Sequence, residues 1–166
     1  MSTINSRITP ISDGYPTCSE CYAQLLIYPG AMHPDDVSKL LGLEPTQKNI
    51  AGTVVTNSRG KTREIKLSGW FLSSEQYVQS KDLREHIDWL LEKIKPLKKE
   101  LIKLQNIDGI TLGIDCVWRS AVGHGGPTLW PEQMRSISDL DLECSFDIYF
   151  DPEGSVSIPA LVPRTF

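Results

Sequence analysis

The sequence predicts an α+β fold: a mainly antiparallel sheet with helices on one face and an added C-terminal strand. Several segments alternate apolar and polar residues with a period of two, which is typical of strands. One long segment instead repeats leucine and isoleucine at helical spacing. The segments follow each other as β-α-β-β-α-β, then a short helix and a last strand. This order is that of a ferredoxin-like, or split βαβ, arrangement.

The first expected strand covers residues 21–28, where both faces carry apolar or aromatic side chains. We expect a short helix over residues 33–41. His33 is its N-cap, Pro34 suits the first helical position and Gly42 is the stop. Residues 50–56 and 63–72 flank turn residues 57–60. This spacing predicts a hairpin, which we place in the main sheet.

The longest helical stripe in the chain predicts a core helix. Pro96 interrupts the stripe and removes a helical hydrogen bond, so we expect a kink, or a break with a second helix. A further strand is expected over residues 110–118, a short helix over 131–137, and a last strand over 141–150 with the cleanest alternation. The stripe consists of Leu83, Ile87, Leu90, Leu91, Ile94, Leu97, Leu101 and Leu104.

Length and composition favour a single globular domain. The chain has 166 residues, of which 40% are hydrophobic and 23% charged. No apolar run approaches the roughly 20 residues that a membrane helix needs, and we see no signal peptide. We therefore expect a flexible N-terminal arm over residues 1–17, one domain over 18–150 and a C-terminal tail over 151–166.

The cysteines argue against a metal or disulfide site. Cys18 and Cys21 form a CxxC pair, but the pair opens a strand pattern, whereas redox pairs usually open a helix. No second CxxC and no paired histidines supply further zinc ligands. Cys116 and Cys144 occupy inward positions of strands, where cysteine behaves as a small apolar residue. We expect four free thiols, no metal, no cofactor and a cytoplasmic location.

The chain resembles a bacterial family known as domain of unknown function 4279, over about residues 20–150. Trp130 departs from that pattern, since a small helix-capping residue is expected before Pro131. The resemblance implies no settled activity. It rests on the order and spacing of residues 33–37 and 41–45, the Gly-Trp-Phe-Leu run at 69–72, the Gly-Gly-Pro loop at 125–127 and the Phe-Asp-Ile-Tyr-Phe run at 146–150.

The loop around His124 is the most unusual stretch. Gly125 and Gly126 follow His124, and glycines let a ligand approach backbone N–H groups closely. A helix follows, so an anion could bind at its N-terminus with His124 as acid or base. No P-loop lysine accompanies it. A turn that simply requires glycine is the alternative interpretation.

Acidic residues dominate the end of the sequence. Residues 108–166 carry nine acidic and three basic side chains, a net charge of −6. Asp115 and Asp147 fall on the polar faces of two expected strands, as do Asp141 and Glu143 near the start of the second. If the strands are neighbours, Asp115 and Asp147 can pair as acid and base or hold a cation; otherwise they belong to a solvated face.

Aromatic side chains and charge bear on nucleic-acid binding. Aromatic residues on a ferredoxin-like sheet can stack bases, but the basic-aromatic motif of RNA-recognition modules is missing here. With a net charge of −4 for the whole chain, we expect no nucleic-acid partner. Packing in the core is the better explanation of Trp70, Trp118, Tyr22 and Tyr28.

These observations favour a non-catalytic interaction protein over an enzyme. We expect its acidic C-terminal surface, including Asp115, Asp141, Glu143 and Asp147, to bind a protein with a basic surface. An immunity-type protein that neutralises a basic toxin is one such form. The alternative is a small enzyme or anionic-ligand-binding domain that uses the His124 loop. The position of the carboxylates, spread over the surface or gathered with His124, separates the two.

Overall fold

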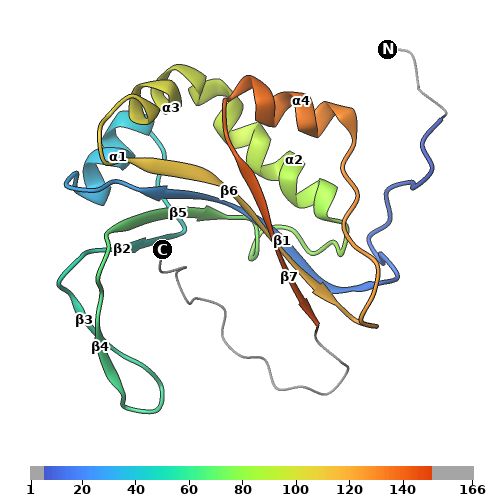
Figure 1. Ribbon diagram of the computed structural model, residues 1–166, viewed down its shortest axis with the longest axis horizontal. Coiled ribbons are helices and arrows are strands. Elements are labelled where there is room, and N and C mark those ends of the chain that lie inside the picture. The colour runs from blue at the N-terminus through green and yellow to red at the C-terminus, as the bar shows by residue number, and fades with distance from the viewer. Residues whose placement is uncertain (1–5, 151–166) are drawn as a thin grey trace.

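The computed structural model describes residues 6–150, which form a five-stranded sheet of order β2-β5-β1-β6-β7 (Figure 1). The central strand β1 pairs antiparallel with β5 and β6, and β2 pairs antiparallel with β5. The last strand, β7, runs parallel to β6 at the edge. The strands are β1 (Cys18–Tyr28), β2 (Gln47–Asn49), β5 (Gly69–Ser73), β6 (Thr111–Ser120) and β7 (Cys144–Phe150).

The four α-helices of the described residues lie on one face of the sheet, as Figure 1 shows. The expected α+β class, the mainly antiparallel sheet and the added C-terminal strand are therefore confirmed. The connections β1-α1-β2, β5-α2 and α3-β6 are compatible with a split βαβ arrangement. Helix α4 connects β6 to the parallel strand β7. The helices are α1 (Pro34–Leu41), α2 (Leu83–Ile94), α3 (Lys98–Gln105) and α4 (Pro131–Asp139).

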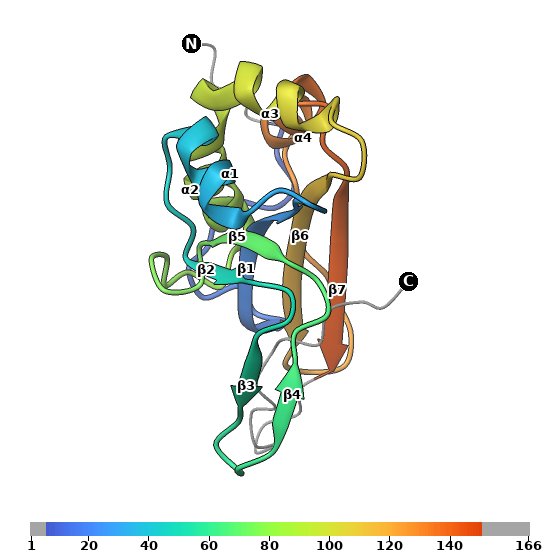
Figure 2. The same ribbon diagram turned by 90° about the vertical axis from the view of Figure 1, so that its left-hand side faces the viewer.

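The predicted hairpin exists, but its place in the main sheet was wrong. Strands β3 (Val54–Thr56) and β4 (Thr62–Glu64) form a separate two-stranded sheet that extends beyond the main one (Figure 2). The main sheet uses β2 and β5, and β5 contains the last residues, 69–72, of the expected second hairpin strand. Both hairpin strands are largely exposed, and β4 also carries the charged side chains of Arg63 and Glu64, so neither strand has a face buried in the core. Burial begins at Gly69, and Trp70 is fully buried.

The leucine stripe packs against the helix-side face of the sheet. Leu90, Leu101 and Leu104 are fully buried with the inward residues of β1. The expected break at Pro96 is confirmed: α2 ends at Ile94, one 3₁₀ turn covers Lys95–Leu97, and α3 begins at Lys98. Proline is tolerated there because it stands in the first turn of a new helical segment.

A buried ion pair attaches the N-terminal segment to the domain. The side chains of Arg84 and Asp82 are both inaccessible to solvent, and Arg84 Nη2 lies 2.6 Å from Asp82 Oδ2. Arg84 also donates hydrogen bonds to the backbone carbonyls of Thr9 and Pro10, and Asp82 accepts one from the Ser12 N–H. The predicted arm, residues 1–17, is described from residue 6 on, and it is held against the domain at Thr9, Pro10 and Ser12 although most of it is exposed. The predicted tail, residues 151–166, lies outside the described residues.

Trp130, where we expected a small helix-capping residue, belongs to the same anchor. The Arg84 guanidinium lies 4.7 Å from the centre of its ring and the Arg7 guanidinium 5.2 Å, which are cation–π distances. Trp130 still serves as the N-cap residue of α4, and its N–H donates to Gln133 Oε1. A small capping residue would lose the aromatic surface on which both guanidinium groups pack.

Leu90→Ala should lower the free energy of unfolding by about 2–5 kcal/mol, because it leaves a cavity under the sheet. Ile102→Ala, in the adjacent helix α3, is the control: Ile102 is 38% exposed, and the loss should be well below that range. Chemical denaturation of both variants measures this. Equal midpoints for Leu90→Ala and the wild type would contradict the assignment of the stripe to the core.

Asp82 should make the stability of the fold sensitive to acid. Burial raises the pKa of Asp82. Hydrogen bonds from Arg84 and from the Ser12 N–H lower this pKa by more than burial raises it, so the net pKa lies below its ordinary value of 3.8. The group therefore contributes stability that is present above that value and is lost as the pH falls through the folded-state pKa.

Asp82→Asn leaves the Arg84 charge buried without its partner and should cost about 3–5 kcal/mol at neutral pH. It should also flatten the dependence of stability on pH below 4. Denaturation curves recorded over a pH series test both effects. A variant with the wild-type acid transition would show that this ion pair does not govern it.

Candidate functional site

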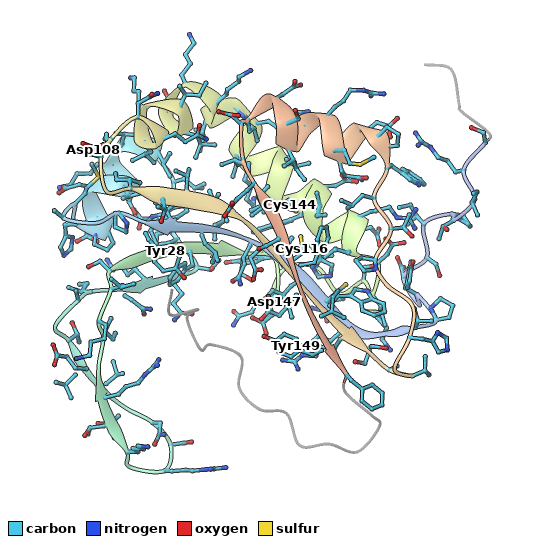
Figure 3. All side chains as sticks on the ribbon, viewed as in Figure 1. Tyr28, Asp108, Cys116, Cys144, Asp147 and Tyr149 are labelled. Atoms are coloured by element: carbon cyan, nitrogen blue, oxygen red, sulfur yellow. The ribbon has the colours of Figure 1, made fainter. Side chains whose placement is uncertain are left out.

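The sheet face opposite the helices is hollowed by a cavity of about 490 Å³, which we call the hollow. It lies across β1, β5, β6 and β7, with Leu67 and Ser68 at the base of the hairpin on one side. Figure 3 shows Tyr28, Asp147 and Tyr149 on the side of the sheet away from the helices. The principal side chains that line the hollow are those of Tyr22, Gln24, Leu26, Tyr28, Phe71, Asp115, Val117, Glu143, Ser145, Asp147 and Tyr149.

Strand periodicity and register bring these side chains together. Alternate residues point to opposite faces, so the inward residues of β6 join the core while Asp115 and Val117 face the hollow. The parallel pairing of β6 with β7 sets Asp115 opposite Ser145 and Val117 opposite Asp147. The two aspartates that we expected on polar faces thus line one cavity on neighbouring strands.

Asp115 is the most enclosed carboxylate of the hollow, with 6% of its surface exposed. One carboxylate oxygen accepts a hydrogen bond from Gln24 Nε2 at 3.1 Å, and the other accepts one from Ser145 Oγ at 3.0 Å. Both donors are neutral, so these bonds orient the carboxylate without neutralising its charge. A cation that enters the hollow therefore meets a fixed negative charge.

Glu143 reaches the same cavity because of a glycine on the neighbouring strand. A Cβ atom at Gly113 would lie 2.8 Å from Cγ of Glu143, which is too close for two carbon atoms. Glycine therefore lets the Glu143 side chain cross β6 at this point. The hollow gathers three carboxylates, those of Asp115, Glu143 and Asp147.

Aromatic rings form much of the remaining surface. Tyr28 and Phe71 meet edge to face, with ring centres 5.6 Å apart. Burial raises the pKa of Tyr22 and of Tyr28, so both phenols stay protonated near neutral pH and are unsuited to act as bases. Arg119 lies 5.2 Å from the ring centre of Tyr149, a cation–π contact next to the hollow.

The His124 loop lies elsewhere. His124, Gly125 and Gly126 do not line the hollow. A Cβ at Gly125 would lie 2.4 Å from Oγ1 of Thr17, and the Tyr15 hydroxyl donates to the Gly126 carbonyl. Gly125 is therefore needed for packing against the N-terminal segment, whereas a Cβ at Gly126 would meet no atom within 4 Å.

Asp141 does not line the hollow, although it shares a second groove with Glu143. It has a φ of 54° just before β7 and lines a second groove of about 390 Å³ between α4 and β7. The structure thus gathers Asp115, Glu143 and Asp147 but leaves out Asp141 and the His124 loop. Sequence reasoning missed Phe71 and Tyr149 as site residues, although Tyr149 alternates in phase with Asp147 and could have been found.

The four cysteines, all in the described part of the chain, are unpaired thiols. Cys116 Sγ and Cys144 Sγ lie 3.8 Å apart on neighbouring strands. Within residues 6–150, no group of three or more His, Cys, Asp or Glu side chains is placed to hold a metal ion. No helix in this same part is long and apolar enough to cross a membrane.

Cys144 should be the first thiol to react with iodoacetamide at neutral pH. The thiol of Cys116 hydrogen-bonds to it and lowers its pKa, and Cys144 is half-buried whereas Cys18, Cys21 and Cys116 are buried. Cys116→Ala should slow this alkylation severalfold because the donor is lost, and Cys21→Ala should leave it unchanged. Peptide mass spectrometry over time measures both rates. Earlier labelling of Cys18 would contradict this order.

Comparison with known proteins identifies the family but no function. The chain matches no curated protein and no solved structure. A family described as "Domain of unknown function (DUF4279)" matches residues 19–151, which include every strand of the sheet apart from the first residue of β1 and all the side chains of the hollow. The hollow therefore lies within the part shared with that family, and the chain belongs to the DUF4279 family.

Proposed function

We propose that this chain is a non-catalytic binding domain whose hollow receives a positively charged segment of a protein partner. One observation carries the proposal: Asp115, Glu143 and Asp147 line the same concave cavity, together with aromatic side chains. This refines the expectation of a broad acidic surface, since the charge is concentrated where a side chain can enter. Low-dielectric walls focus the field of such a cleft.

The lining supports a lysine or arginine side chain as the entering group. Its aliphatic stem can pack on Leu26 and Val117, while carboxylates attract the charged end. The faces of Tyr28 and Phe71 can add a cation–π contribution. The charge of Asp115 is already oriented by Gln24 and Ser145, so binding does not have to order it.

Catalysis receives less support. An enzyme that used His124 as acid or base would need it beside a carboxylate, yet His124 is not among the residues of the hollow. The protonated phenols of Tyr22 and Tyr28 are poor bases at neutral pH. An anion would be repelled by the three carboxylates.

An immunity-type protein that neutralises a basic toxin is one form that this function would take. Carboxylates that line such a cleft attract a basic partner over a long range and so raise its association rate. A cytoplasmic location is part of the proposal, and the four unpaired thiols support it because thiols persist in a reducing compartment.

Titration with a short peptide in which lysine alternates with glycine tests the proposal. NMR amide shifts should change around the hollow, at residues such as Gly113 and Ser145, and binding should weaken as salt is added. Glu143→Gln should raise the dissociation constant roughly three- to tenfold without changing the denaturation midpoint, because Glu143 is exposed.

Asp141→Asn is the matched control, because it removes one carboxylate outside the hollow and should leave the affinity nearly unchanged. A peptide with glutamate in place of lysine should not bind. Equal affinity for both peptides, or shift changes confined to the helix layer, would overturn the proposal. Arginine amide as a second ligand separates recognition of one side chain from recognition of an extended segment.

A further inference from the structure

The hairpin β3–β4 is a second charged element that the proposed function does not use. With the two residues that follow it, it covers residues 54–66 and carries Arg59, Lys61, Arg63 and Lys66 against a single acidic residue, Glu64, a net charge of +3. All five are exposed. Among the ion pairs of residues 6–150, these cations contribute only Lys66 with Glu64, at 3.8 Å. The hairpin therefore presents its positive charge to solvent.

The hairpin is well ordered at its tip but poorly supported along its length. Asn57 Oδ1 accepts hydrogen bonds from the N–H groups of Arg59 and Lys61, which fixes the turn. Each strand has only three residues, and an isolated two-stranded ribbon is marginally stable in water. Val54 is 64% exposed and Leu67 61% exposed at its base. Such a ribbon gains stability when another surface covers it.

The same chain carries a surface of opposite charge. The hollow holds three carboxylates and has Leu67 at its rim, next to the base of the hairpin. Arg63 lies in β4 and Lys61 directly precedes this strand, so the alternation of an extended chain places both on one face of the ribbon. Figures 1 and 2 show the hairpin extending away from the helix layer and beyond the main sheet, where a second molecule can reach it.

We propose that two copies of this chain associate by placing the hairpin of each in the hollow of the other. Lys61 and Arg63 of one copy then face Asp115 and Glu143 of its partner. A two-fold axis makes the two contacts identical, so the assembly closes as a dimer. The inference rests on the proposed function only in taking the hollow as a cation-binding surface, and the second copy competes there with a basic protein.

Sedimentation velocity over a series of protein concentrations and salt concentrations tests the dimer. The wild type should self-associate at low salt and dissociate as salt is added. Lys61→Glu/Arg63→Glu and, separately, Glu143→Lys should each weaken self-association about tenfold or more. Lys98→Glu/Lys99→Glu, the same charge change on the exposed surface of α3, should leave it nearly unaltered by comparison.

A mixture of the two defective variants provides the sharper result. The hairpin variant keeps an intact hollow and the Glu143→Lys variant keeps an intact hairpin, so the mixture should form a heterodimer through one good contact. A wild type that stays monomeric at every concentration would overturn the inference. So would a hairpin variant that still dimerises, because it would place the contact on another surface.

The two proposals fail separately. Lys61→Glu/Arg63→Glu should still bind the lysine peptide, with shift changes around Gly113 and Ser145. Peptide binding without self-association would reject the dimer and keep the hollow as a basic-segment site. Loss of peptide binding in wild-type monomers would reject the proposed function itself.

Discussion

The fold depends on one constraint: helices cover only one face of a sheet whose central strand carries apolar and aromatic side chains on both faces. On the helix side, Ala23, Leu25 and Ile27 of β1 are completely buried. On the other side Tyr22 is almost as buried, yet no helix lies above it within the described residues. Neighbouring aromatic rings and the Asp115 network must therefore protect that face, and the same groups form the hollow.

The local patterns that could be read from the sequence were those in which one residue decides the outcome. Pro96 ends α2, and Gly42, with φ of 63°, ends α1. Strand pairing was harder because periodicity does not say which segments meet. Strand β2 has three residues without alternation and depends on its pairing with β5. The turn residues correctly predicted a hairpin, but they did not indicate that β2, before the hairpin, is the strand that pairs with β5 in the main sheet.

The site followed the same division. Alternation alone indicated that Asp115 and Asp147 share a side of the sheet, and the parallel register of β6 and β7 made them neighbours. The glycines beside His124 are compatible both with a ligand that approaches the backbone and with tight packing. Only the position of Thr17 beside Gly125 favours packing. Arg84 could not be recognised as buried, since a charged helical residue ordinarily faces solvent and its partners Thr9 and Pro10 are distant in sequence.

Strand β7 also has a consequence for how the protein is made. It joins the sheet beside β6 only after the chain has passed through α4, so it leaves the ribosome after the other strands of the described sheet. The preceding strands can pair before it arrives, whereas the cavity lacks Ser145, Asp147 and Tyr149 until then. A nascent chain therefore acquires a protected core before it acquires a complete binding surface. Chain order alone therefore makes the hollow one of the last parts of the described fold to be completed.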